Sequence, residues 1–123
     1  MAERQLPVKV EKPWGGETIF AWTDRYVGKI LHVKAGHSLS LQYHRVKDET
    51  IYLAAGRMDL EVEEGQQMRR VDMASGDFYR IRPEVKHRMH AREDCTIFEV
   101  STPELDDVVR LEDKYGREGT SAP

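Results

Sequence analysis

Short stretches of alternating polar and apolar residues, each followed by a turn residue, run through most of this 123-residue chain. An amphipathic helix needs an apolar period of about 3.6 residues sustained over roughly 12 residues, and the middle of the chain has no such window. A period of two residues is typical of half-buried strands. The sequence therefore predicts an all-β fold with strands over 18–22, 26–33, 38–44, 49–54, 58–63, 68–73, 77–82, 86–91 and 95–101.

Glycines end several of the expected strands. Gly36, Gly56, Gly65 and Gly76 stand where tight turns can require a positive φ angle. The clearest hairpin spans 58–73 across Gly65, with acidic residues on its first half and arginines on its second. Its charges indicate a face exposed to solvent.

Helix-start signals appear only near the end of the chain. Thr102 can cap a helix, Pro103 fits a first turn and Glu104 suits the positive end of a helix dipole. We therefore expect a short C-terminal helix or turn over the LDDVVRLED that follows. Residues 1–5 and 117–123 are expected to fray, within a single domain over 1–123.

Charge and composition exclude several classes of partner. The net charge is −3 and the basic residues form no block, so we do not expect nucleic-acid binding. No run approaches the roughly 18 apolar residues that span a bilayer, and the start of the chain does not resemble a signal peptide. We expect a cytoplasmic protein with no membrane contact. Cys95, the only cysteine, lies in the apolar run CTIFEV and is expected to be a buried, inert thiol.

The predicted strand over 38–44 has one wholly polar face. Ser38, Ser40, Gln42 and His44 alternate with the apolar residues of the other face. Solvent-exposed faces favour lysine and glutamate, so this series indicates the lining of a pocket. The apolar face, formed by Leu39, Leu41 and Tyr43, then points outward and must be covered by the N-terminal segment or by a second copy of the chain. A homodimer is the natural expectation.

The spacing of Gly36, Gln42, His44, Glu49 and Gly56 is G-x5-Q-x-H-x4-E-x6-G, and ten residues separate Gly76 from His87. These two segments resemble the two halves of the cupin signature, in which two histidines and a glutamate of the first half and a histidine of the second bind a metal. Gln42 replaces the first histidine here. The resulting Gln/His/Glu/His set resembles the metal site of mannose-6-phosphate isomerases, including the cupin domain of the bifunctional isomerase/guanylyltransferases.

The resemblance extends along most of the chain, and its most specific pieces are KPWG, LSLQ-x-H and RLEDKYGR in that order. It implies a double-stranded β-helix, also called a jelly-roll barrel, that binds one divalent transition metal ion through Gln42, His44, Glu49 and His87. It further implies aldose–ketose isomerisation of a sugar or sugar phosphate. Trp14 of KPWG either stacks on sugar or packs over the end of the barrel.

The chemistry of these residues agrees with the resemblance. Imidazole, carboxylate and amide ligands suit Zn, Mn, Fe, Co or Ni and leave positions open for substrate. Isomerisation also needs a group that handles a proton, and the candidates are Glu99 and Lys29. A phosphate needs cationic anchors, for which Arg88, Lys47 and Arg82 are the candidates.

Two other functions remain open. The family's usual run like HHHRSEHW is HRVKDETI here, so Val46, Lys47 and Thr50 replace residues that are typically His, Arg and His. The chain could instead be a non-catalytic cupin that binds a sugar or another small ligand through the same metal. A dioxygenase would use a similar site with Fe(II), although a glutamine ligand favours it less.

Overall fold

The computed structural model describes residues 1–120 and contains only strands, turns and loops over that range. The all-β prediction is therefore confirmed. The strands are β1 (Val8–Lys12), β2 (Gly15–Trp22), β3 (Val27–Val33), β4 (Leu41–Tyr43), β5 (Glu49–Ala55), β6 (Arg57–Glu64), β7 (Gln67–Ala74), β8 (Phe78–Ile81), β9 (His87–Ala91), β10 (Cys95–Ser101), β11 (Val109–Glu112) and β12 (Gly119–Thr120).

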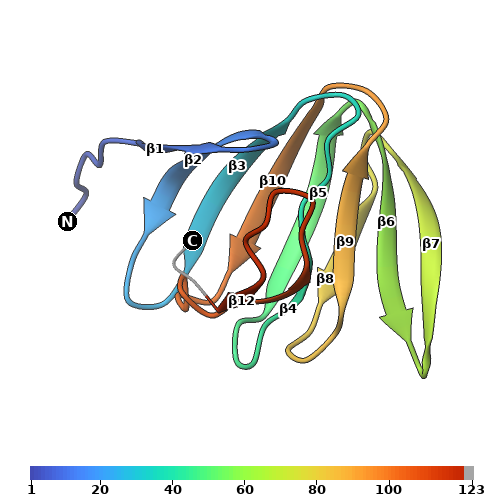
Figure 1. Ribbon diagram of the computed structural model, residues 1–123. Coiled ribbons are helices and arrows are strands. Elements are labelled where there is room, and N and C mark those ends of the chain that lie inside the picture. The colour runs from blue at the N-terminus through green and yellow to red at the C-terminus, as the bar shows by residue number, and fades with distance from the viewer. Residues whose placement is uncertain (121–123) are drawn as a thin grey trace.

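The strands form two antiparallel sheets. One has the order β1-β2-β3-β10-β5-β8 and the other the order β12-β11-β4-β9-β6-β7. Pairs such as β3 with β10 and β4 with β11 join strands that are far apart in the sequence. The two sheets face each other across a shared interior (Figure 1). This is the jelly-roll arrangement that the resemblance implies.

The main hydrophobic core lies between the sheets. Ile51 and Leu53 of β5, Leu60 of β6 and Ile97 of β10 are almost fully buried. Tyr52, which alternates with Ile51 and Leu53, is exposed, as the two-residue period requires. Burying each large aliphatic side chain contributes about 1.5–3 kcal/mol, so the alternation determines which face of each sheet turns inward.

The last glycine of the first motif is required by the backbone. Gly56, in the turn between β5 and β6, has a φ angle of 98°. A Cβ atom there would lie 2.4 Å from the carbonyl oxygen of Asp94. Any other residue would be strained in conformation and would collide with backbone. This glycine therefore serves the turn that follows the ligand-bearing strand, not the chemistry of the site.

The segment after Pro103 forms turns and a strand. Of the two structures expected there, the helix is wrong and the turn is confirmed. Residues 102–108 contain bends and turns, and Val109–Glu112 then forms β11. Val109 pairs with Tyr43 of β4. β-Branched residues favour strands, and here the open edge of β4 supplies a partner that a local helix signal does not reveal.

The predicted strand over 38–44 is regular only over Leu41–Tyr43. Ser38 forms an isolated bridge with His90, and the amide of Leu39 donates to the carbonyl of Met89. The irregular backbone turns Leu39 into the main core instead of outward, contrary to expectation. Only Leu41 and Tyr43 remain as a half-buried apolar pair, so the outward apolar face predicted from this strand is much reduced.

The ends of the chain differ from each other. Residues 1–7 are exposed and form no strand. The C-terminal tail is held more firmly, because Arg117 donates a hydrogen bond to the carboxylate of Asp113 and β12 pairs with β11. Residues 121–123, the last of the expected frayed tail, lie outside the described range.

Nowhere in residues 1–120 is there a helix with the length and apolar character needed to traverse a bilayer.

Candidate metal centre

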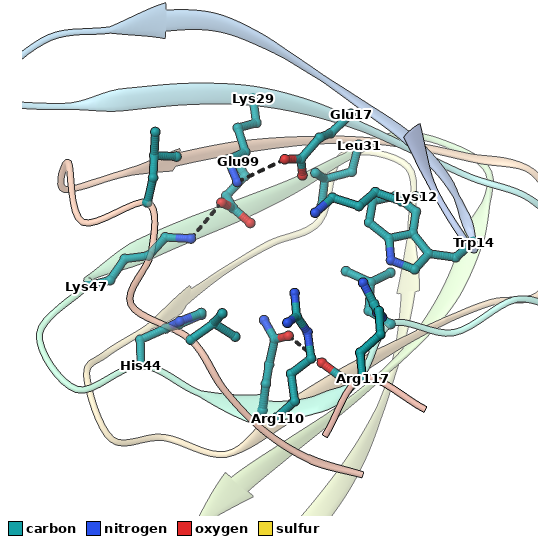
Figure 2. Close-up of a pocket in the computed structure, with 15 residues that line it drawn as sticks. Lys12, Trp14, Glu17, Lys29, Leu31, His44, Lys47, Glu99, Arg110 and Arg117 are labelled. Atoms are coloured by element: carbon teal, nitrogen blue, oxygen red, sulfur yellow. Dashed lines mark hydrogen bonds and ion pairs between the residues drawn. The ribbon is translucent and has the colours of Figure 1, made fainter. Parts of the chain in front are cut away.

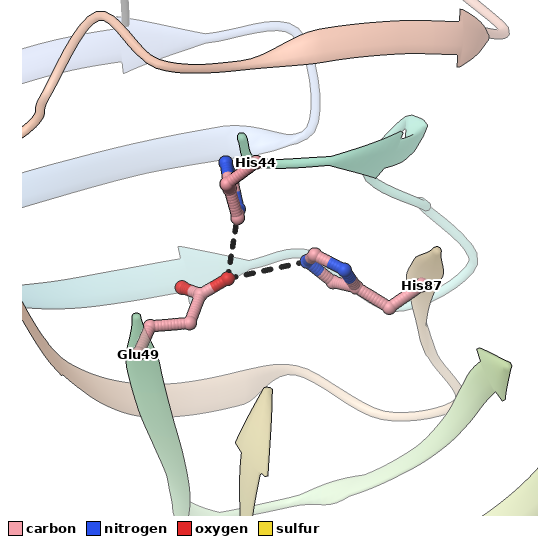
Figure 3. Close-up of side chains that lie close together, drawn as sticks. All are labelled: His44, Glu49 and His87. Atoms are coloured by element: carbon pink, nitrogen blue, oxygen red, sulfur yellow. Dashed lines mark hydrogen bonds and ion pairs between the residues drawn. The ribbon is translucent and has the colours of Figure 1, made fainter. Parts of the chain in front are cut away.

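Three side chains from separate segments meet inside the barrel. His44 follows β4, Glu49 begins β5 and His87 begins β9. Oε1 of Glu49 lies 2.8 Å from Nε2 of His44 and 3.2 Å from Nε2 of His87 (Figure 3). All three are buried, and one ligand atom from each lies within 4.8 Å of the others. The convergence expected from the motif spacing is present for these three residues.

The hydrogen bonds of the two histidines leave both Nε2 atoms facing the carboxylate. Nδ1 of His44 lies 2.6 Å from the carbonyl oxygen of Asp107, and Nδ1 of His87 lies 3.0 Å from that of Val85. A carbonyl oxygen only accepts, so each Nδ1 carries the proton. Nε2 of His44 lies within hydrogen-bonding distance of Oε1 of Glu49, whereas Nε2 of His87 makes no hydrogen bond of good geometry. In neutral imidazoles both Nε2 atoms would present lone pairs to the carboxylate.

Three acceptors that converge in a buried space repel one another unless positive charge lies between them. A divalent cation supplies that charge, and histidine Nε2 with a carbonyl-bound Nδ1 is the usual form of a metal-binding histidine. The donor set therefore fits a transition metal ion. Two imidazoles and a carboxylate leave coordination positions for further ligands.

Gln42 lies on β4 and points to the same side as His44, since only Tyr43 separates them, and it pairs across the sheet with His87. Its Oε1 accepts a hydrogen bond from the hydroxyl of Ser40 at 2.6 Å. Gln42, Ser40 and His44 all line one cavity. Gln42 is thus placed beside the cluster, and its role as a fourth ligand remains a prediction.

Asp107 holds the loop that carries His44. Its carboxylate accepts hydrogen bonds from the backbone amides of Arg45, Val46 and Lys47 at 2.7–3.0 Å. Burial alone would raise the pKa of Asp107, but these three donors outweigh it and hold the pKa below its ordinary value. Through its carbonyl oxygen Asp107 also orients the ring of His44. Sequence reasoning missed this residue.

A cavity of about 60 Å³ adjoins the cluster (Figure 2). Its wall carries an unusual number of charged side chains for so small a space. The basic ones are Lys12, Lys29, Lys47, Arg110 and Arg117, and the acidic ones are Glu17 and Glu99.

A chain of buried charges links the cavity to the cluster. Nζ of Lys47 lies 3.1 Å from Oε2 of Glu99 and 3.8 Å from Oε2 of Glu49. Burial opposes the charge of Lys47, yet the two carboxylates raise its pKa. Burial and the charge of Glu49 raise the pKa of Glu99. Burial would do the same to Glu49, but the neighbouring charge of Lys47 holds its pKa well below the ordinary value.

The structure brings some of the other predicted residues to the cavity and leaves two outside. Glu99, Lys47 and Lys29 line it, and Nζ of Lys29 lies 3.4 Å from Oε1 of Glu17. Arg88 follows His87 on β9, so its side chain points to the opposite face, where it donates to the carbonyl of Glu112 at 3.0 Å.

Arg82 is exposed beyond the end of β8 and does not line the cavity. Neither Arg88 nor Arg82 is therefore placed to anchor a phosphate in the cavity. Sequence reasoning instead missed the cations Lys12, Arg110 and Arg117. The signal was present, because these residues lie in KPWG and RLEDKYGR, two motifs whose basic residues had been given no role.

Similar folds occur among solved structures. KdgF from Halomonas sp. is 19% identical over 78% of this chain and 86% of its own, with a TM-score of 0.66. Oxalate decarboxylase from Lactobacillus farciminis is 18% identical over 85% of this chain, with a TM-score of 0.73. A putative sugar phosphate isomerase from Acidithiobacillus ferrooxidans is 17% identical over 68%, with a TM-score of 0.59.

This chain spans 33% of that oxalate decarboxylase and 55% of that isomerase. At such low identities the likeness shows the fold and not the activity. No curated protein sequence matches the chain significantly. A family model described as a cupin domain matches residues 29–101, a range that contains His44, Glu49 and His87. Because this match covers more than half of the sequence, the chain belongs to the cupin family.

Proposed function

We propose that the protein is a metal-dependent isomerase that interconverts the aldose and ketose forms of a sugar or sugar phosphate, in the manner of mannose-6-phosphate isomerase. The observation that carries the proposal is the buried carboxylate of Glu99, held by Lys47 in the same cavity that His44 adjoins. A metal centre beside a group that handles protons is the arrangement that this reaction needs. A putative sugar phosphate isomerase has a similar fold, which is compatible with this class of substrate.

His44, Glu49 and His87, with Gln42, would hold one divalent ion among Zn, Mn, Fe, Co and Ni. When bound, such an ion polarises a carbonyl or hydroxyl oxygen of the substrate. In the aldose-to-ketose direction a proton leaves C2 and a proton is added at C1, while the O2 proton moves to O1. We assign the carbon-bound proton to the carboxylate of Glu99. Lys29, paired with Glu17, is the second candidate for proton handling.

Turnover of mannose 6-phosphate by metal-loaded protein in deuterated water tests this proposal. We expect fructose 6-phosphate that carries deuterium, as measured by NMR, because the proton on Glu99 exchanges with solvent. Product without deuterium would indicate a hydride shift and would remove Glu99 from its role. No turnover under any of the five metals, or oxygen consumption with Fe(II), would refute the isomerase.

One observation favours a second function. The cavity of about 60 Å³ has room for on the order of four water molecules, which is less than a whole hexose phosphate occupies. A non-catalytic cupin that binds a small ligand through its metal would need no more space. Retained ligand binding without turnover or label exchange would identify this function.

We also propose that the protein is a homodimer. The outer face of β2, β10 and β5 exposes Phe20, Phe98 and Tyr52, with the centroid of the Phe98 ring 6.4 Å from each of the other two. Contiguous exposed aromatic rings are characteristic of interfaces between proteins. A second copy of the same face would cover them through a twofold axis.

Phe98→Glu is expected to convert the dimer to a monomer, because a charge at the centre of the patch would be buried without a partner. Sedimentation velocity measures this change. Glu64→Gln, at the exposed tip of the β6–β7 hairpin, is the control and should remain dimeric. A wild-type protein that sediments as a monomer at micromolar concentration would contradict the proposal.

We propose further that residues 1–123 form one domain and that the protein acts in the cytoplasm. Strands β3 and β5 to β10 contribute to a single main core. Cys95 is buried within it, and burial raises the pKa of its thiol, so the thiol is protonated and unreactive.

A further inference from the structure

The N-terminal arm, residues 1–7, continues the side-chain pattern of β1 but has no cover. Leu6, Val8 and Val10 are two residues apart, the period that places side chains on one face of an extended chain. Val10 is half-buried, Val8 is 44% exposed and Leu6 is 80% exposed. The apolar stripe therefore runs off the body of the protein, and Figure 1 shows the first residues leading away from it.

Pro7 explains why the arm leaves β2. Proline has no amide hydrogen, so Pro7 cannot donate to a neighbouring strand, and the pairing of β1 with β2 begins at Val8. A residue that precedes a proline favours extended backbone, so Leu6 is kept outstretched. The arm is thereby suited to reach another molecule.

A groove lies beside the arm, between β1, β2 and the turn at 103–107. Its volume is about 740 Å³, within the range of roughly 300–1,000 Å³ that is usual for pockets with a bound molecule. The apolar residues of its walls are Val8, Val10, Ile19, Trp22, Pro103 and Leu105. Trp22 is 52% exposed, so much of this apolar surface has no cover within the chain.

One wall of the groove holds a carboxylate with an unmatched oxygen. Glu104 lines the groove, and its Oε2 is buried without a hydrogen-bond partner in residues 1–120. A buried carboxylate oxygen in this state is costly, and a cation from outside the chain would stabilise it. Asp106, exposed on the same turn, adds a second negative charge. The groove is therefore suited to an apolar segment that carries a positive charge.

The arm has this composition. Arg4 lies two residues before Leu6, on the same face of an extended chain and about 7 Å from it. Leu6 can thus enter the apolar part of a groove while Arg4 faces the carboxylate. The arm of the same chain does not fill the groove, because its Gln5 and Leu6 border a neighbouring pocket beside Phe20 instead. A second copy of the chain supplies another arm.

We propose that the arm of a second copy of this chain occupies the groove, with Leu6 between the apolar walls and Arg4 against Glu104. Two copies exchange their arms about a twofold axis, so each groove is filled. This inference rests on the proposed homodimer and adds a contact to it. Phe20 borders the arm and also belongs to the exposed aromatic patch, so the two contacts form one continuous interface.

Charge reversal on the two sides of the contact tests the exchange. Arg4→Glu and Glu104→Arg should each raise the dissociation constant of the dimer about tenfold or more in sedimentation velocity, because like charges then meet at both grooves. An equimolar mixture of the two variants should return to within about threefold of the wild-type value, since every arm then meets a groove of opposite charge. Arg69→Glu makes the same change at an exposed hairpin tip and should dimerise like the wild type.

Variants of Leu6 test the apolar part of the contact. Leu6→Asp should weaken the dimer to a similar extent, whereas Leu6→Met keeps an apolar side chain of similar volume and should not. Residues 4 and 6 are exposed, so their substitution leaves the fold intact. The melting temperature of Glu104→Arg shows whether that variant is folded.

The outcomes separate the arm from the rest of the dimer. Wild-type association in Leu6→Asp and in both charge reversals would refute the exchange and leave the aromatic interface standing. If the double variant Arg4→Glu/Glu104→Arg regained association but the mixture did not, the arm would dock in its own chain, contrary to the proposal. If Phe98→Glu stayed dimeric while the arm variants dissociated, the exchange would stand and the aromatic interface would fail. A monomeric wild type would refute both.

Discussion

Replacing His44 and His87 together with alanine is expected to abolish stoichiometric metal binding. The two Nε2 atoms and Oε1 of Glu49 form the cluster, and one carboxylate alone does not hold a transition metal tightly. Elemental analysis after dialysis should show about one metal per wild-type chain and almost none in the double variant. The metal should also raise the melting temperature of the wild type, because a hundredfold excess over Kd adds about 2.7 kcal/mol to the free energy of unfolding, and it should leave the melting temperature of the variant unchanged.

His32→Ala is the matched control, because His32 is exposed on β3 and lies outside the cluster. It should retain full metal content. His44→Gln with His87→Gln repeats the test with side chains of similar size, in case alanine leaves the charge of Glu49 too poorly supported for folding. Stoichiometric metal in either folded double variant would show that the site has been placed wrongly.

Glu99→Gln is expected to lower kcat of the isomerase by roughly 10²–10⁴, the usual contribution of a positioned general base. The amide keeps the size of the side chain but cannot accept the proton. Because Glu99 is not among the clustered metal ligands, metal content should stay at the wild-type level. Steady-state kinetics with mannose 6-phosphate and elemental analysis of the same samples measure both quantities. The KM should change much less than kcat.

Glu64→Gln makes the same chemical change at an exposed site and should have wild-type kinetics. If kcat of Glu99→Gln stayed within a few-fold of the wild-type value, the role in proton transfer would belong to another residue, and Lys29 would be the next candidate. Loss of metal in Glu99→Gln would instead mean that the carboxylate supports the cluster and that its effect on turnover is indirect.

Much of the fold could be predicted from the sequence because strand alternation is a local property. The burial of Ile51 and Leu53 against the exposure of Tyr52 follows directly from that pattern. The strand β11 could not be predicted from local alternation. Thr102, Pro103 and Glu104 carry helix-start signals, and only pairing with β4, more than sixty residues earlier, makes the following segment a strand.

The cluster of possible metal ligands was predictable because the spacing of its residues resembles the cupin signature. His44, Glu49 and His87 occupy signature positions, and the structure brings all three together. Arg88 was predicted to bind the substrate, but because it follows His87 directly on a strand, its side chain lies on the opposite face. Lys12 and Arg117 could not be placed beside each other, since their meeting depends on the tertiary arrangement of β1 and of the segment after β11.

Asp107 connects the loop that carries His44 to the C-terminal turn. Its carboxylate accepts hydrogen bonds from the backbone amides of residues 45–47, and its carbonyl oxygen accepts one from the ring of His44. Metal binding at His44 and ordering of that turn would therefore be thermodynamically linked, and each would favour the other by the same free energy. The same turn leads into β11, which carries Arg110. A ligand that orders the C-terminal segment would in this way tighten the hold on the ion, even without touching it.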